Sequence, residues 1–382
     1  MRGRLTEEQQ LIQATARDFA AREVLPVANE RDPQRGDIPP ALVERLAELG
    51  FFGILIPEDY GGSGLGCLEY CLVTEELSRA WMSVSSIIRP MIGMHALSDA
   101  QKAKYLPRMA RGAALGAFAF SEPNAGSDLS SLACRARRDG SEWVITGNKY
   151  WCTFADGADY ILVLARTDPA ARRHRGISAF MVEKARGSLP AGVHGAPIPK
   201  IGYFGWKTWE LSFDECRVPA LNMVGEEGKG FYVATSGLEV ARAHTAARAI
   251  GLARGALEDA IAYAKERVQF GHPLADFQAI RFKLAGMATE VEAARSLLHQ
   301  VCGMIDTGER CDKEAAMAKL QATEMAERVT SDALQILGGA GYTTLHAVER
   351  YWRDARLTKI FEGTSEIQMK IISDHLLGKT GR

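Results

Sequence analysis

The chain has 382 residues, more than one compact core usually holds, so we expect two or three domains. Its 46 basic and 47 acidic residues nearly cancel, which argues against a general attraction to nucleic acid or to an anionic membrane. No signal-peptide pattern or membrane-spanning run is visible. The seven cysteines contain no CxxC pair and the histidines no HExxH pattern, so we expect free thiols, no metal and a cytoplasmic protein.

Residues 1–112 are predicted to form an N-terminal α-helical domain. Apolar residues recur at three- and four-residue spacing over residues 7–23, 40–49 and 67–79. A turn-rich segment, residues 57–64, separates the last two of these helices.

Residues 113–220 change in character and predict a middle antiparallel β domain. Short runs of strand-forming residues are separated by polar turns such as Asp139-Gly140. The expected strands are residues 118–120, 133–138, 143–145, 160–165, 178–182 and 208–213.

Residues 221–382 are predicted to be helical again. Three long alanine- and leucine-rich segments, 247–267, 277–305 and 313–337, predict a C-terminal four-helix bundle. The expected fold class is therefore α+β, in the order helices, sheet, helices.

Glu362 is a candidate general base. It follows Ile360 and Phe361 and precedes Gly-Thr-Ser, which predicts a junction between two helices. Burial there would raise the pKa of the carboxyl group and make it a usable base. The alternative from the residues alone is a surface or capping acid.

Two segments of the β domain could contact a flat, phosphorylated cofactor. The small residues of 121–128 allow close backbone approach to a phosphate, although an ordinary turn explains them too. Trp151 could stack on an aromatic ring while Thr153 donates a hydrogen bond, or both could belong to the core. The glycines near the end of the helix 313–337 do not match a Rossmann fingerprint.

Six segments together resemble the acyl-CoA dehydrogenase family, in the family's order and over nearly the whole chain. They are Pro57-Glu-Asp-Tyr-Gly-Gly, Ser121-Glu-Pro-Asn-Ala-Gly-Ser-Asp, Lys149-Tyr-Trp-Cys-Thr, Arg267-Val-Gln-Phe-Gly, Gln335-Ile-Leu-Gly-Gly-Ala-Gly-Tyr and Phe361-Glu-Gly-Thr-Ser-Glu. The resemblance implies FAD, an acyl-CoA substrate, a homotetramer built as a dimer of dimers, and an electron-transferring flavoprotein as partner.

The resemblance also assigns cofactor contacts by position. Residues that resemble contacts to the FAD of their own subunit are Phe118, Phe120, Ser121, Ser127, Trp151, Thr153, Thr364 and Glu366. Residues that resemble contacts to the FAD of a neighbouring subunit are Arg267, Phe270, Gln278, Gln335 and Gly339. The family more often has Gln than Glu at the position of Glu366.

The resemblance implies that Glu362 removes the Cα proton while the β-hydride passes to flavin N5. Some relatives carry the base just before the arginine that corresponds to Arg242, but here that position is Ala241. Glu239 and Arg242 resemble coenzyme A contacts, and Gly363 follows the base at the substrate. Hydrogen bonds to the thioester oxygen would stabilise the enolate-like charge.

By resemblance to the family, Arg89 falls on the helix that forms the floor of the acyl pocket. Family members that act on fatty acyl groups carry no cation there, so Arg89 is a departure from their pattern. A buried guanidinium requires an anion, and a second carboxylate on the substrate would provide one. The arrangement resembles that of glutaryl-CoA dehydrogenases, which bind the distal carboxylate of their substrate with an arginine on this helix. Their arginine lies four residues earlier, where this chain has Ser85. We therefore expect a substituted succinyl thioester, such as benzylsuccinyl-CoA or methylsuccinyl-CoA.

Three alternatives remain open from the sequence. Arg89 could instead face solvent or pair with a protein acid, which would favour an ordinary short- or medium-chain acyl-CoA dehydrogenase. A glutaryl-CoA-type enzyme and a dehydrogenase of acyl groups on a carrier protein are the others.

Overall fold

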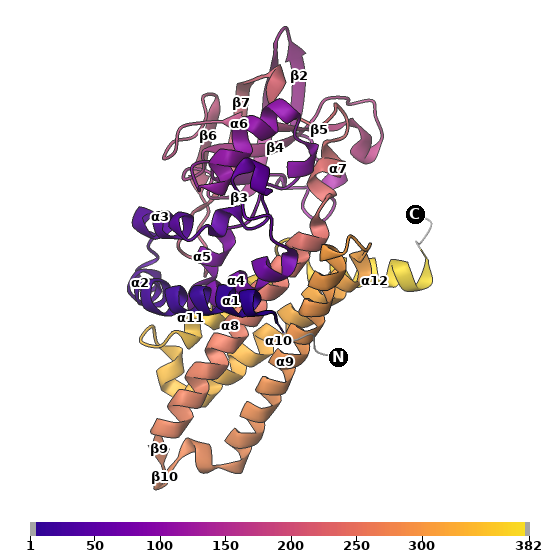
Figure 1. The fold of residues 1–382 in the computed structure, drawn as a ribbon. Coiled ribbons are helices and arrows are strands. Elements are labelled where there is room, and N and C mark those ends of the chain that lie inside the picture. Colours follow the sequence, from indigo (N-terminus) through magenta and orange to yellow (C-terminus); the bar gives the residue numbers. More distant parts are fainter. Residues whose placement is uncertain (1–4, 379–382) are drawn as a thin grey trace.

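The computed structural model describes residues 5–378, and its helical and sheet regions follow the expected order (Figure 1). The predicted helix over 7–23 is instead a helix followed by one π-helical turn, Ala20–Val24, before the chain continues into α2. The N-terminal helices are α1 Glu7–Phe19, α2 Leu25–Arg31, α3 Pro40–Glu48, α4 Cys67–Ala80, α5 Met82–Ile87 and α6 Asp99–Ala110.

The middle region is one sheet, with strands in the order β6-β7-β3-β2-β4-β5-β8 and β1 paired with β4. It is mixed, not purely antiparallel as predicted, because β1 runs parallel to β4. Parallel pairing requires a long connection, and here the β2–β3 hairpin supplies it. The strands are β1 Gly116–Ala119, β2 Arg135–Asp139, β3 Glu142–Thr153, β4 Tyr160–Arg166, β5 Ile177–Glu183, β6 Val193–Pro197, β7 Thr208–Pro219 and β8 Met223–Val224.

The C-terminal region packs long helices on one another and on α4. Its α8 begins at Leu238, nine residues before the predicted start. The prediction followed the alanine-rich segment and left out the first turns of the helix, which contain charged residues. The short β9–β10 hairpin joins α8 to α9 at the tip farthest from the sheet (Figure 1). The elements are α7 Gly230–Thr235, α8 Leu238–Glu266, β9 Val268–Gln269, β10 His272–Pro273, α9 Gln278–Asp306, α10 Asp312–Leu337, α11 Val348–Thr358 and α12 Ser365–Leu377.

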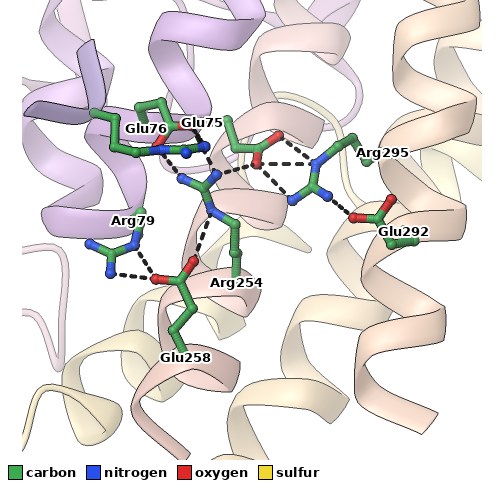
Figure 2. Close-up of polar contacts among 8 residues, drawn as sticks. Glu75, Glu76, Arg79, Arg254, Glu258, Glu292 and Arg295 are labelled. Atoms are coloured by element: carbon green, nitrogen blue, oxygen red, sulfur yellow. Dashed lines mark hydrogen bonds and ion pairs between the residues drawn. The ribbon is translucent and has the colours of Figure 1, made fainter. Parts of the chain in front are cut away.

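A network of charged side chains connects α4, α8 and α9 (Figure 2). Arg254 of α8 pairs with Glu75 and Glu76 of α4, both of which are almost fully buried. Arg295 of α9 also donates to Glu75, and Arg79 pairs with Glu258. Each of these arginines forms an ion pair with a glutamate of the network. The network therefore holds the three helices in fixed relative positions.

Three of the seven cysteines, which look scattered in the sequence, meet in the core. The sulfur of Cys67 lies 3.7 Å from that of Cys302 and 4.0 Å from that of Cys71. All seven are free thiols, as expected. Within residues 5–378, no helix combines the length and the apolar character that crossing a bilayer requires.

Candidate functional site

Glu362 lies in the short loop between α11 and α12, and the loop holds it in an unusual backbone conformation. Glu362 has φ +53° and Gly363 has φ +91°. The carbonyl oxygen of Gly363 accepts hydrogen bonds from Lys319 Nζ at 2.7 Å and from Gln368 Nε2 at 2.9 Å. Thr364 then caps α12 by accepting from the backbone N–H of Ile367. A left-handed non-glycine residue held on several sides is typical of a functional position.

The carboxylate of Glu362 points at α8. Arg248 Nη2 donates to Oε1 at 2.7 Å, and Thr245 Oγ1 donates to Oε2 at 2.8 Å. Arg248 is itself almost fully buried, donates to Ser86 Oγ and lies with its guanidinium 4.4 Å from the centre of the Phe361 ring. The carboxylate is therefore held by a buried ion pair and a hydroxyl.

The environment of Glu362 corrects the expectation that its pKa is raised. Burial does raise the pKa, but the neighbouring positive groups, led by Arg248, and the hydrogen bond from Thr245 outweigh burial and lower it to about 2. An opposite charge within hydrogen-bond distance favours the ionised form more than desolvation disfavours it. Glu362 is thus an ion-paired carboxylate in this structure.

Arg89 faces the same carboxylate from the end of α5. Its Nη1 lies 3.8 Å from Glu362 Oε1, and its guanidinium lies 4.1 Å from the centre of the Phe118 ring on β1. The side chain is about a quarter exposed. Arg89 therefore lies beside the candidate base and not on an outer surface.

Two buried polar side chains, His244 and Tyr70, interact electrostatically with Glu362. His244 and Ser85 meet through His244 Nε2 and the Ser85 carbonyl oxygen, 3.0 Å apart, and His244 stacks on Tyr70. Burial lowers the pKa of His244 to about 3, so it is neutral at pH 7. The buried hydroxyl of Tyr70 has no hydrogen-bond partner. Ser85 Oγ donates to the Met82 carbonyl oxygen of its own helix, so it is already satisfied.

Glu239 and Arg242 lie in the first turns of α8. Arg242 is buried, and burial lowers its pKa. Its Nη1 lies 3.8 Å from Asp312 Oδ1 and makes no hydrogen bond. A buried guanidinium with an unsatisfied donor fits an anionic ligand, because such a donor costs free energy until it is paired.

The candidate cofactor residues of the β domain lie on β1, on β3 and in the loop after β1. Trp151 has φ +63° and leaves 57 % of its surface exposed, so it is not a core residue. Thr153 Oγ1 lies 3.0 Å from Thr208 Oγ1. Phe118 and Phe120 pack together with ring centres 5.5 Å apart. Ser121 accepts a hydrogen bond from the backbone of Tyr150 through its carbonyl oxygen, and Ser127 is exposed.

The remaining cofactor candidates lie in the C-terminal region and not on the sheet. Arg267 and Phe270 lie at the β9–β10 tip, opposite the sheet (Figure 1). Phe270 is 93 % exposed, and Gln278 starts α9 nearby with an exposed side chain. Gln335 and Gly339 are exposed at the end of α10, and Glu366 is exposed in the first turn of α12.

The sequence reasoning missed Arg248, Thr245 and Lys319. All three are buried in long helices and converge on residues 362 and 363. A signal was present, since Arg248 interrupts the apolar run of residues 246–253. Only the packing of α8 and α10 against the 360–364 loop assigns these residues to the site.

Three family models match the chain in consecutive segments. They are the acyl-CoA dehydrogenase N-terminal domain over residues 6–113, the middle domain over 117–216 and the C-terminal domain over 228–377.

Similar proteins extend over almost the whole chain. An acyl-CoA dehydrogenase of Bacillus subtilis (strain 168) is 42 % identical over 98 % of this chain and 100 % of its own. The (2S)-methylsuccinyl-CoA dehydrogenase of Cereibacter sphaeroides is 44 % identical over 98 % of this chain and 70 % of its own. A solved structure described as the electron transferring flavoprotein of Acidaminococcus fermentans has a chain with a TM-score of 0.93 and 38 % identity, covering 99 % of this chain and 100 % of that one. The chain belongs to the acyl-CoA dehydrogenase family.

Proposed function

We propose that this acyl-CoA dehydrogenase oxidises a coenzyme A thioester whose acyl group carries a second carboxylate, with Glu362 as the base. Two C–H bonds break, one at Cα and one at Cβ, and a double bond forms between these carbons. The observation that supports the proposal is the pair of guanidinium groups, Arg89 and Arg248, at one carboxylate.

The family uses FAD, and the residues of this chain fit that cofactor. The exposed indole of Trp151 offers a flat apolar face, and Thr153 supplies a hydroxyl two residues away on the same strand. The exposed Ser127 hydroxyl suits a phosphate. Bound FAD supplies the acceptor for the hydride that leaves Cβ.

Glu362 would receive the Cα proton, and its own backbone supports the reaction. Its N–H donates to no backbone acceptor within residues 5–378, so it is available to a thioester oxygen. The hydrogen bonds to the Gly363 carbonyl oxygen restrain the loop that carries this N–H. A preorganised donor at a developing oxyanion typically contributes about 3–4 kcal/mol to the lowering of a barrier.

The charge balance supports a carboxylate on the acyl group. One carboxylate, Glu362, faces two guanidinium groups, which leaves an excess of positive charge. Arg89 makes no hydrogen bond to another described residue and rests on the Phe118 ring. A substrate carboxylate would complete the set through charge-assisted hydrogen bonds. The 44 % identity to a methylsuccinyl-CoA dehydrogenase supports a substituted succinyl group.

We propose the electron-transferring flavoprotein as electron acceptor and a homotetramer as the assembly. The similarity to a chain in the electron transferring flavoprotein structure supports the first. The exposed Phe270, at the tip remote from Trp151, supports the second, because large exposed aromatic side chains often lie in interfaces.

Anaerobic bleaching of the flavin by a panel of thioesters tests the proposal. The panel contains butyryl-, octanoyl-, glutaryl-, methylsuccinyl- and benzylsuccinyl-CoA. We expect bleaching by the succinyl-type members, and a loss of about 10²- to 10⁴-fold in its rate for Glu362→Gln, which keeps the shape but cannot accept the proton. Bleaching by butyryl- and octanoyl-CoA alone would refute the proposal that the acyl group carries a second carboxylate. Bleaching by none of the thioesters would favour an acyl group bound to a carrier protein.

A further inference from the structure

Arg248 holds the proposed base in a form that is poorly suited to its task. A base with a pKa of about 2 is a weak proton acceptor, since general bases work best with pKa values near the operating pH. Both carboxylate oxygens are already engaged, by Arg248 and by Thr245. The base must therefore lose its strongest partner before it can remove a proton of low acidity.

We propose that Arg248 is a specificity-determining residue whose guanidinium is transferred from Glu362 to the carboxylate of the substrate, so that a carboxylate-bearing acyl group releases the base. This inference rests on the proposed function. Arg248 has free capacity for the exchange, because its buried Nε has no hydrogen-bond partner. Arg89 lies 3.8 Å from the same oxygen of Glu362 and can hold the other side of the incoming carboxylate.

The distances favour a carboxylate close to Cα. Arg248 Nη2 and Arg89 Nη1 lie 2.7 and 3.8 Å from Glu362 Oε1. A carboxylate that pairs with both, at about 2.8 Å from each nitrogen, lies within about 6 Å of the base. The reacting Cα lies about 3–3.5 Å from the base in a productive complex. A carboxylate attached to Cβ, as in a succinyl thioester, meets both requirements, while a plain fatty chain leaves Arg248 on Glu362.

The ionisable groups around Glu362 determine the pH range in which a kinetic experiment can detect its titration. Arg248 and His244 face it from α8, Arg89 from the end of α5, Lys319 from α10, and Tyr70 from α4. Burial lowers the pKa of His244 to about 3 and that of Lys319 to about 8, and it raises the pKa of Tyr70 well above its usual value. Removing Arg248 takes away the strongest interaction that lowers the pKa of Glu362, and it also takes away an interaction that lowers the pKa of His244, so both groups contribute to the pH profile between pH 4 and 7.

The test compares the holoenzyme with Arg248→Gln, using methylsuccinyl-CoA and butyryl-CoA as substrates and stopped-flow flavin bleaching at pH 4–7. We expect the variant to lose about 100-fold in kcat/KM for methylsuccinyl-CoA, since a buried charge contact is removed. For butyryl-CoA we expect kcat/KM to rise, because this substrate cannot draw Arg248 away from Glu362 in the wild type, and we expect a new acid limb in the pH profile as the pKa of Glu362 rises. We expect no such limb for butyryl-CoA in the wild type, because Arg248 keeps the pKa of Glu362 low.

Two further variants separate this role from a structural one. Lys319→Met removes a buried cation on the other side of the 360–364 loop, and we expect it to slow both substrates equally. Arg248→Lys keeps the positive charge but lacks the planar guanidinium that can bind a carboxylate through two hydrogen bonds. We expect its preference for methylsuccinyl-CoA over butyryl-CoA to lie between those of the wild type and Arg248→Gln. Equilibrium binding of methylsuccinyl-CoA to Glu362→Gln, with and without Arg248→Gln, measures the carboxylate contact without turnover, and we expect about 100-fold weaker binding without Arg248.

The outcomes distinguish the inference from the proposed function. A parallel loss for both substrates, or an unchanged pH profile, in Arg248→Gln would refute the role of Arg248 while methylsuccinyl-CoA oxidation by the wild type stood. Should Arg248→Gln not fold, an Arg248→Lys variant with the wild-type preference would refute it equally. Absence of bleaching by every thioester in the wild type would refute the proposed function itself.

Discussion

Lys319 donates from Nζ to the backbone carbonyl oxygen of Gly363 at 2.7 Å, which connects the first half of α10 to the residue after the proposed base. Lys319 is completely buried, and burial lowers its pKa to about 8. A lysine in this position is costly to desolvate, and its hydrogen bond restrains the loop that carries Glu362.

Replacing Lys319 with Met should therefore disturb catalysis more than folding. Met has a similar length but cannot donate to Gly363, so of the two described hydrogen bonds to the Gly363 carbonyl oxygen only the one from Gln368 is left. We expect kcat to fall by about 10-fold for every thioester accepted, since small displacements of reacting groups are costly. Lys370→Met, at an exposed lysine of α12, is the control and should leave kcat unchanged.

Trp151→Ala should weaken cofactor binding without unfolding the protein. The indole is mostly exposed and contributes little to the core. We expect the FAD dissociation constant, measured by fluorescence titration of the apoprotein, to rise about 10-fold, as loss of one aromatic contact predicts. The matched control is Trp352→Ala, at another partly exposed tryptophan, on α11. Equal FAD affinity in Trp151→Ala and the wild type would exclude Trp151 from the cofactor site.

Asp354→Asn should stabilise the protein increasingly as the pH rises. Burial and the neighbouring Asp32 raise the pKa of Asp354 to about 7, and its Oδ1 accepts from the Tyr203 N–H. Between pH of about 4 and 7 the folded state keeps a proton that the unfolded state has released, so wild-type stability falls as pH rises. Asn accepts the same hydrogen bond without ionising.

The measurement for Asp354→Asn is the denaturation midpoint at pH 5 and at pH 8. We expect a small difference from the wild type at pH 5 and a gain of at least about 1 kcal/mol at pH 8. A difference that does not change with pH would show that Asp354 is ionised throughout.

Arg254→Met should destabilise the helix packing strongly. The replacement leaves Glu75 with Arg295 and Glu76 with Arg17, and removes the guanidinium that both buried acids share (Figure 2). Breaking a buried pair in this way costs about 3–5 kcal/mol. Chemical denaturation should show this loss, whereas Arg217→Gln, in exposed pairs on β7, should cost less than about 1 kcal/mol.

The family and the order of the helical and sheet regions could be predicted from the sequence. Helical periodicity, strand-forming runs and the six family segments depend on neighbouring residues, so they can be read without a structure. Glu362, with glycine after it, was identified in this way as the candidate base. The domain boundaries at residues 112 and 220 and the roles of the individual site residues remain predictions.

The direction of the pKa shift at Glu362 depends on contacts that form only when the chain folds. Glu362, Arg248 and Arg89 are far apart in sequence, and the packing of α8 and the end of α5 against one loop brings both guanidinium groups within 4 Å of the Glu362 carboxylate. Burial alone would have raised the pKa of Glu362, and the guanidinium of Arg248 reverses the direction. The parallel pairing of β1 with β4 was likewise hidden, because the strand pattern gives the spacing of side chains and not the partner strand. Electrostatic interactions fall with distance through space, not along the chain, and only the fold sets those distances.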